Sequence, residues 1–363
     1  MKVAIVHYWL VGMRGGEKVL EELLDVFPEA DVYSHVIDEN AVSEAVRRRY
    51  RGSSFINRLP FAKRLYQIYL PFMPLALEQL DLRGYDLVIS SESGPAKGVI
   101  VDPEALHVCY CHSPMRYVWD MYHDYRERSG WLKKLFMPFL LHYLRMWDVS
   151  TAQRVTYFVA NSGYVASRIR QYYHRHSEVI FPPVAVDEFD VVGRKQGYYL
   201  LVGELVSYKR ADLAVSAFAE NGKSLKVVGG GEQFKELAAH ATPNIEFLGK
   251  VEFEKLKHLY ADAEALIFPG VEDFGMVPVE AMASGTPVIA YAKGGALETV
   301  KEGVSGLFFT EQSVESLNEA VERFETGAVD FEPEKLREYA RQFDKSHFRS
   351  KITNFINEKM VKK

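Results

Sequence analysis

The feature that most constrains the fold of this chain is a repeated order of three segments: an apolar run, a loop rich in glycine or polar residues, and a helix-forming stretch. It first occurs at residues 2–8, which lead to Gly15-Gly16 and a predicted helix at about 17–27. Strands that alternate with helices predict parallel sheets. We therefore predict an α/β chain with Rossmann-like, doubly wound parallel sheets. Further apolar runs of this kind occupy residues 31–34, 86–90, 106–110, 156–160, 198–202, 225–228, 245–248, 265–269 and 285–290.

The length of 363 residues is sufficient for two such domains. We predict an N-terminal domain at 1–184, a C-terminal domain at 185–340 and a C-terminal helix at 341–363. The net charge of −5 argues that the chain as a whole does not bind nucleic acid. Ligands of open α/β sheets bind beyond the carboxyl ends of the strands, so the loops that follow strands are the candidate sites.

One of these loops carries two glutamates, Glu272 and Glu280, in the segment EDFGMVPVE. An apolar run precedes it and a short helix is predicted to follow, with Pro278 at the first helical position. The start of a helix offers unbonded N–H groups and a partial positive charge, which favour an anion. A carboxylate beside that anion can accept hydrogen bonds from sugar hydroxyls. The pair therefore predicts a site for a sugar nucleotide, whereas two solvated or capping glutamates are the plainer alternative.

The sequence also indicates where the protein works. The two cysteines, Cys109 and Cys111, are separated by one residue on a predicted strand, which favours reduced thiols in a reducing compartment. A core strand follows Met1 almost directly, so we expect no signal peptide. No apolar run is long enough to span a bilayer. We expect a cytoplasmic protein.

A basic and aromatic segment from Arg47 to Leu80 is predicted to be helical. A basic face next to an aromatic face is typical of a helix that lies in a membrane interface. We expect peripheral binding to an anionic membrane on its inner face, where a lipid-linked acceptor would be met. An ordinary amphipathic helix, or a site for an acceptor phosphate, is the alternative. The residues expected to contact membrane or acceptor are Arg47, Arg48, Arg49, Arg51, Lys63 and Arg64.

The chain resembles the retaining GT-B glycosyltransferases of family 4, which include sucrose synthases and bacterial polysaccharide mannosyltransferases. The resemblance covers nearly the whole chain, and the two glutamates eight residues apart are its most specific part. The segments HSPMRYVWD at 112–120 and Tyr208-Lys209-Arg210 resemble the O-antigen type of mannosyltransferase. The resemblance implies a GT-B fold, in which two Rossmann-like domains face a central crevice, and a final helix that crosses back to the first domain.

The resemblance also implies roles for particular residues. Catalytic roles fall to His112, Lys209 and Glu272: His112 contacts the donor sugar or the departing phosphate without acting as a classical general base, Lys209 binds the diphosphate, and Glu272 binds the hydroxyls of the transferred sugar. Glu280 is expected to bind the ribose. The other residues expected to contact the nucleotide sugar are Gly15, Gly16, Arg210, Lys250, Val251, Phe274, Gly275 and Met276.

The sequence departs from the family at Glu204, where the family has an arginine. Arg210 or Arg14 is a possible replacement, and a catalytically inactive scaffold is the alternative that this departure raises. We expect no metal, because no Asp-x-Asp motif occurs in the chain.

The function implied is transfer of a hexose, with mannose from GDP-mannose as the expected donor, to a glycan or lipid-linked acceptor. A UDP-hexose donor is the alternative within the class. A sugar-nucleotide 2-epimerase and a two-lobed periplasmic solute receptor are the alternatives outside it.

Overall fold

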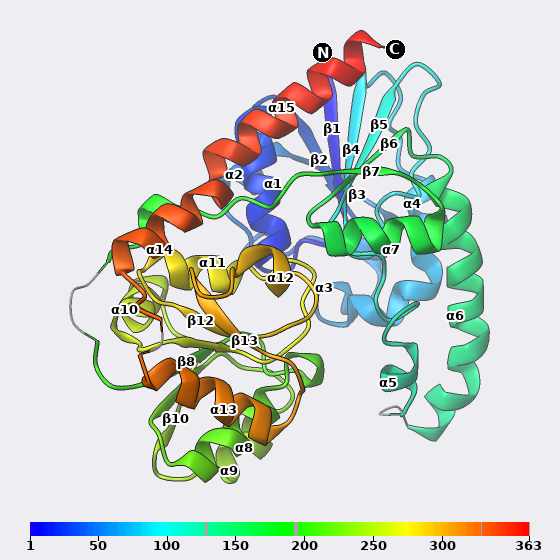
Figure 1. Ribbon diagram of the computed structural model, residues 1–363. Helices are drawn as coiled ribbons and strands as arrows, with labels where there is room; N and C mark the ends of the chain where they lie inside the picture. The colour runs from blue at the N-terminus through cyan, green and yellow to red at the C-terminus, as the bar shows by residue number, and fades with distance from the viewer. Residues whose placement is uncertain (128–129, 192–194, 328, 363) are drawn as a thin grey trace. The chain divides into compact units, whose positions relative to one another are not determined.

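The computed structural model describes residues 1–127, 130–191, 195–327 and 329–362 (Figure 1). The chain forms two compact units. The first comprises Met1–Phe181 together with Arg349–Lys363, and the second comprises Pro182–Phe348. Each unit contains one parallel sheet with helices packed against it, as the alternation in the sequence predicts.

The first unit has a seven-stranded sheet in the order β3-β2-β1-β4-β5-β6-β7. The central strands are buried on both faces, which explains why they are almost continuously apolar in sequence. In the register of β1 with β4, His7 lies opposite Ser91 at the carboxyl ends of the two strands. The strands are β1 (Val3–His7), β2 (Asp31–Ser34), β3 (Tyr50–Ser53), β4 (Leu87–Glu92), β5 (Leu106–Cys111), β6 (Tyr157–Ala160) and β7 (Ser177–Val179).

Helix α7 begins after Ser162, whose hydroxyl accepts the N–H of Val165 at 3.0 Å and so caps the helix. The helical segments are α1 (Gly15–Val26), α2 (Glu44–Arg49), η1 (Phe55–Arg58), α3 (Ala62–Leu65), η2 (Tyr66–Phe72), α4 (Met73–Glu78), α5 (Tyr122–Glu127), α6 (Trp131–Ala152) and α7 (Gly163–Tyr173).

The second unit has a six-stranded parallel sheet in the order β10-β9-β8-β11-β12-β13. Its edge strand β13 was not among the predicted runs. The elements are β8 (Tyr199–Val202), β9 (Leu225–Val228), β10 (Ile245–Gly249), β11 (Leu266–Phe268), β12 (Val288–Tyr291), β13 (Gly306–Phe309), η3 (Val186–Glu188), η4 (Ser207–Lys209), α8 (Ala211–Asn221), α9 (Phe234–Ala239), α10 (Phe253–Asp262), α11 (Met276–Ala283), α12 (Ala296–Thr299), α13 (Val314–Glu325), α14 (Pro333–Ala340) and η5 (Arg341–Phe343).

The last helix, α15 (Lys345–Val361), begins in the second unit, and its residues from Arg349 onward belong to the first. Ile352 and Ile356 are buried, and the ring of Phe355 packs edge-on against Tyr157 of β6, with 6.2 Å between centroids. Arg349 forms ion pairs with Glu22 and Asp25 of α1. The C-terminal residues are therefore part of the packing of the first unit.

Two local predictions were wrong. The segment from Arg47 to Leu80 is not one helix but a strand, β3, and several short helical turns. Proline at positions 60, 71 and 74 removes backbone donors, which prevents one long helix. Helix α11 begins at Met276, so Pro278 is its third residue rather than its first. It follows Gly275, whose φ of 88° brings the chain into the helix through a left-handed conformation.

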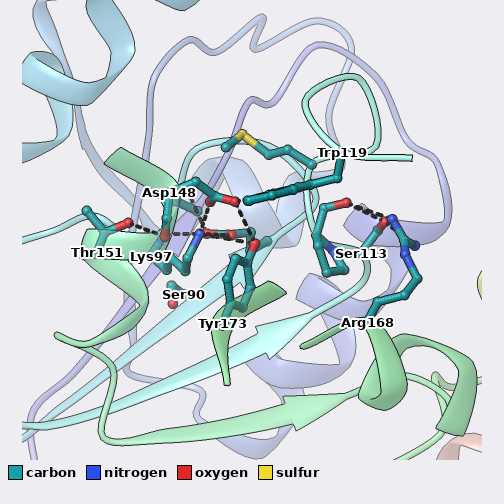
Figure 2. A network of polar contacts seen from close by, with 12 residues as sticks. Ser90, Lys97, Ser113, Trp119, Asp148, Thr151, Arg168 and Tyr173 are labelled. Carbon is teal, nitrogen blue, oxygen red and sulfur yellow. Dashed lines mark hydrogen bonds and ion pairs between the residues drawn. The ribbon is translucent and has the colours of Figure 1, made fainter. Parts of the chain in front are cut away.

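A fully buried ionic cluster holds the loops of the first unit together (Figure 2). The Lys97 ammonium contacts Glu92 Oε1 at 2.7 Å and also Asp148, and all three side chains are completely buried. Tyr173 and Trp119 donate hydrogen bonds to Asp148 Oδ2 at 2.9 and 2.8 Å. The cluster therefore joins the end of β4 and the loop after it to α6, to α7 and to the segment that follows β5.

Burial and the neighbouring charges shift the pKa values of Glu92 and Lys97. Desolvation raises the pKa of Glu92, and the nearby Asp148 carboxylate adds to that effect, while Lys97 only partly opposes it. For Lys97, burial lowers the pKa, but the two carboxylates outweigh burial and keep the amine protonated. The Lys97 ammonium is therefore the cation that balances the charge of the two buried acids, Glu92 and Asp148.

We expect Lys97→Met to destabilise the first unit by about 3–5 kcal/mol, because it leaves buried carboxylates without a cation. All four tryptophans lie within residues 1–181, so their fluorescence during urea unfolding reports on this unit. Lys63→Met is the matched control, since its ion pair with Asp38 is exposed and should contribute less than about 1 kcal/mol. Equal shifts of the unfolding midpoint in the two variants would contradict the role given to the cluster.

Candidate functional site

In the second unit, Lys209 and Glu272 meet at the carboxyl ends of β8 and β11. Lys209 Nζ lies 3.1 Å from Glu272 Oε1, and each side chain is about one-fifth exposed. Both residues line a small hollow that also includes Gly203, Glu204 and Gly270. A side chain at Gly270 would not fit, because its Cβ would lie 2.6 Å from the Lys209 Cα. The structure thus brings together two of the three predicted catalytic residues.

The electrostatics of this pair keep the lysine charged. Burial of the Lys209 amine lowers its pKa, but the Glu272 carboxylate, Tyr208 and Glu204 raise it, and the net result is a pKa above the ordinary value. Glu204, the residue that departs from the family pattern, therefore lies close enough to interact with the amine. A cation next to a partly open hollow is suited to hold an anionic group.

Glu280 occupies the helix that follows Glu272. It lies in α11 and is 7% exposed, and its Oε2 accepts a hydrogen bond from the hydroxyl of Tyr260 in α10 at 2.9 Å. The hydroxyl fixes the orientation of the carboxylate. The Phe274 ring is buried and packs edge-on against Phe343, so its backbone is the part of the residue that can face a ligand. Gly275 is buried beside it, and Met276 is half-buried.

Glycines allow the loops of this unit to touch one another. A Cβ on Gly295 would lie 2.4 Å from the backbone of Phe274, and the Gly295 N–H donates to the Glu272 carbonyl at 2.9 Å. Gly229, which follows β9, has a φ of 130°, and a Cβ added to it would lie 1.8 Å from the Gly203 carbonyl oxygen. The close approach that these glycines permit is therefore between neighbouring loops of the chain itself.

The remaining predicted nucleotide contacts of this unit are placed differently. Lys250 is exposed at the end of β10, with its side-chain carbons near Gly230, and Val251 beside it is half-buried. Arg210 adopts a left-handed conformation at the start of α8, and its Nε donates to both Asp212 oxygens at 3.1 Å. Its guanidinium is thus engaged by Asp212 in its own helix.

In the first unit, His112 belongs to a chain of polar side chains at the carboxyl ends of β1, β4 and β5. Its Nε2 lies 2.8 Å from Ser91 Oγ, and Ser91 Oγ lies 3.0 Å from His7 Nδ1. His7 Nε2 lies 3.6 Å from Glu17 Oε1. We call these four residues the His–Ser–His chain. Sequence reasoning missed His7, although it stands at a strand end, the position at which the other candidates were found.

Gly16, in the first turn of α1, packs against the ring of Tyr8. A Cβ on Gly16 would lie 2.5 Å from the Tyr8 hydroxyl oxygen, so a side chain there would displace Tyr8. Gly15 is the first residue of α1, and the N–H of Arg14 donates to Glu17 Oε2 at 3.0 Å. This turn therefore needs glycine for its own packing, independently of any ligand.

Among the basic residues predicted to meet a membrane, Arg48, Arg49 and Lys63 are paired with acids. Arg49 forms two hydrogen bonds with Glu29, at 2.6 and 3.0 Å, and Arg48 pairs with Glu44. Arg47 donates to a backbone carbonyl at 3.5 Å, and Lys63 pairs with Asp38 at 3.4 Å. Arg51 and Arg64 are exposed. The cluster is thus less positive than the local sequence indicates.

A set of exposed apolar side chains lies on α6 and on the segment 61–75. The two segments share one buried cluster, against which Leu70 and Leu140 pack. The exposed fraction reaches 74% at Trp131, 65% at Phe136 and 75% at Phe139. We call this set the apolar face, and its members are Phe61, Leu65, Ile68, Phe72, Leu75, Trp131, Leu132, Leu135, Phe136, Phe139, Tyr143 and Met146.

No helix in the described parts of the chain is long and apolar enough to cross a membrane. Nor do the described residues contain a group of three or more His, Cys, Asp or Glu side chains arranged to hold a metal ion.

Two family models match consecutive parts of the chain. The model described as glycosyltransferase family 4 matches residues 13–188, and the model described as glycosyl transferases group 1 matches residues 188–343.

Curated relatives are distant. The α-1,3/1,6-mannosyltransferase ALG2 of Saccharomyces cerevisiae is 26% identical over 298 residues, which cover 66% of this chain and 56% of that protein. The O-antigen chain mannosyltransferase RfbU of Salmonella typhimurium is 26% identical over 263 residues, which cover 65% of this chain and 68% of that protein. Matches to two uncharacterized glycosyltransferases of Methanocaldococcus jannaschii cover 36% and 20% of those proteins. The chain thus spans about half or less of the length of several relatives.

Solved structures share the fold over the full length. The Anabaena protein HepE, in a crystal structure with UDP-glucose, superimposes with a TM-score of 0.72 at 18% identity, covering 99% of this chain and 100% of that one.

We expect Gly295→Ala to destabilise the second unit by about 1–3 kcal/mol, because the added methyl group must displace the Phe274 backbone. Hydrogen exchange of the amides at 272–276 should become faster, and the thermal midpoint should fall. Gly230→Ala is the control, since its Cβ would meet only Lys250 carbons at an ordinary 3.7 Å. Unchanged exchange at 272–276 in Gly295→Ala would show that the two loops do not depend on this contact.

Proposed function

Because this chain belongs to the family 4 glycosyltransferases and has the GT-B fold, we propose that it transfers mannose from GDP-mannose, with retention of configuration, to a glycan or lipid-linked acceptor. The observation that carries the proposal is the ion pair between Lys209 and Glu272. The loop that carries Glu272 leads directly into α11, the helix that contains Glu280. These three residues offer a cation for a diphosphate and two carboxylates for hydroxyl groups.

Before the donor binds, the Lys209 ammonium is paired with the Glu272 carboxylate. When a nucleotide sugar enters, the diphosphate replaces Glu272 as the partner of the Lys209 ammonium. Glu272 is then available to accept hydrogen bonds from the transferred sugar. As the glycosidic bond breaks, negative charge grows on the diphosphate, and a fixed cation in a partly closed site stabilises that charge strongly. Glu280, oriented by Tyr260, accepts hydrogen bonds from the ribose hydroxyls.

The choice of mannose is supported by the mannosyltransferases ALG2 and RfbU among the relatives. The guanine base rests only on the resemblance to mannosyltransferases described above. A UDP-hexose is the second candidate, since HepE was crystallised with UDP-glucose. Thermal unfolding with GDP, UDP or ADP separates the candidates, because a ligand that binds only the folded protein raises its stability by about 2.7 kcal/mol at a hundredfold excess over its dissociation constant.

We further propose that the first unit binds an anionic membrane, on which it meets a lipid-linked acceptor. The apolar face is the main support, because Trp131, Phe136 and Phe139 lie within nine residues of α6 and each is at least 65% exposed, and large exposed apolar patches are characteristic of interaction sites. Lys63, Arg64 and Lys134 lie on the segments that carry it and are exposed, which complements an anionic lipid surface. Since Arg48 and Arg49 are paired with acids, α6 rather than the arginines of α2 supplies most of the binding energy.

We expect Lys209→Ala and Glu280→Ala each to weaken the binding of GDP by about tenfold or more, since each removes a charged hydrogen-bonding group. Glu272→Ala should reduce transfer more than it reduces GDP binding, because its partner is the sugar. Isothermal calorimetry measures the affinities, and Lys301→Ala, an exposed lysine of the same unit, is the control. Unchanged GDP and UDP affinity in both Lys209→Ala and Glu280→Ala would exclude this site.

We expect the protein to co-sediment with phosphatidylglycerol vesicles at low salt. The triple substitution Trp131→Ser, Phe136→Ser and Phe139→Ser should abolish this binding, because each buried aromatic ring contributes about 1.5–3 kcal/mol. Changing Arg47, Arg48, Arg49 and Arg51 to Glu should weaken binding less.

The control is the double substitution Leu297→Ser and Val304→Ser, which changes two exposed apolar residues of the second unit. A wild-type protein that stays in the supernatant, or a triple variant that still sediments, would contradict membrane binding through α6.

A further inference from the structure

The His–Ser–His chain connects the surface of the first unit to a buried carboxylate. His7 and Ser91 are completely buried and Glu17 is 2% exposed, whereas His112 is half-buried. The four residues come from four places in the sequence: the ends of β1 and β4, the residue after β5, and the first turn of α1. The parallel sheet brings them into one line.

The charge of the Glu17 carboxylate determines which atoms along this line carry a hydrogen. Burial raises the pKa of Glu17, but the contact with His7 and the backbone N–H groups of Glu17 and Arg14 outweigh it, so that the pKa is lower than usual. Glu17 Oε1 faces His7 Nε2 at 3.6 Å, a distance at which the attraction is electrostatic. A negative charge at this position favours a hydrogen on Nε2, because the alternative would place a lone pair against the carboxylate.

The hydrogen bonds then follow in order. With its hydrogen on Nε2, a neutral His7 accepts at Nδ1, so the Ser91 hydroxyl donates to His7. The Ser91 oxygen is left with lone pairs only, and His112 must donate its Nε2–H to it. A serine alone could either donate or accept, and would leave His112 undetermined. When His7 is neutral, the charge of Glu17 removes that ambiguity.

We propose that Glu17, His7 and Ser91 are positioning residues that set His112 in the Nε2–H tautomer, so that Nδ1 is its acceptor nitrogen and receives a hydrogen bond from a hydroxyl of the transferred sugar. The contact with the sugar rests on the proposed function, whereas the tautomer does not. The Tyr8 ring supports the arrangement by packing on His7, with 4.1 Å between centroids. Tyr110 packs edge-on against His112 at 5.1 Å and limits its rotation.

The tautomer can be measured without any substrate, from two-dimensional ¹⁵N spectra of protein labelled in histidine. We expect His112 in the wild type to carry its hydrogen on Nε2. Glu17→Gln, which keeps the shape but removes the charge, should give a mixture of tautomers, and so should Ser91→Ala. Ser91→Thr, which retains a hydroxyl, should restore the wild-type spectrum.

The neighbouring residue supplies a matched control. Ser90 is equally buried on the same strand, and its Oγ lies 3.0 Å from Nε2 of another buried histidine, His107. Ser90→Ala should therefore leave the His112 tautomer unchanged. If His112 carries its hydrogen on Nδ1 in the wild type, or if Glu17→Gln leaves a single Nε2–H tautomer, the proposal is overturned. The wild-type measurement decides this even if a variant does not fold.

Kinetics test the second half of the proposal. Ser91→Ala and Glu17→Gln should lower kcat/KM for the sugar-nucleotide donor about tenfold, the loss expected for one hydrogen bond, while calorimetric affinity for the bare nucleoside diphosphate stays the same. Altered tautomers with unchanged kcat/KM would overturn the contact with the sugar. Loss of nucleotide binding in Lys209→Ala and Glu280→Ala is a separate result, so failure of the donor site and failure of the His–Ser–His chain are distinguishable.

Discussion

The parallel direction of every strand pair in both sheets is the constraint on which the candidate sites depend. It places all carboxyl ends of one sheet at one edge, so residues that are distant in sequence become neighbours there. His7 and Ser91 are adjacent in register for this reason, and Lys209 reaches Glu272 from the loop after β8. The same crowding explains Gly270 and Gly295, where the loops pass too close for a side chain.

Strand β4 shows how the first unit accommodates polar groups in its interior. Ser91 and Glu92 are consecutive, and successive strand residues point to opposite faces of a sheet. Ser91 joins the two histidines, whereas Glu92 binds Lys97 in the ionic cluster. The Glu92 carbonyl also accepts the N–H of His112 at 2.8 Å. The ionic cluster and the His–Ser–His chain are therefore joined at one peptide unit, and a distortion of either would displace His112.

Local patterns predicted the sheets well, because apolar periodicity and turn residues are properties of short segments. The segment EDFGMVPVE likewise led to a loop and helix that the structure contains. What the sequence did not reveal are relations between distant residues. The arginines of α2 looked unpaired, yet Arg49 meets Glu29, and the buried Lys97 meets Asp148 of α6. The register that places Ser91 between His7 and His112 also follows from strand order, which no local pattern encodes.

Helix α15 gives the chain an order of assembly. The first unit contains Met1–Phe181, but it also needs Arg349–Lys363, whose residues Ile352 and Ile356 are buried against it and whose Arg349 pairs with α1. During synthesis on the ribosome, residues 182–348 are made between these two parts. The first unit, although most of it is translated first, therefore cannot complete its packing until residues 349–363 have been made.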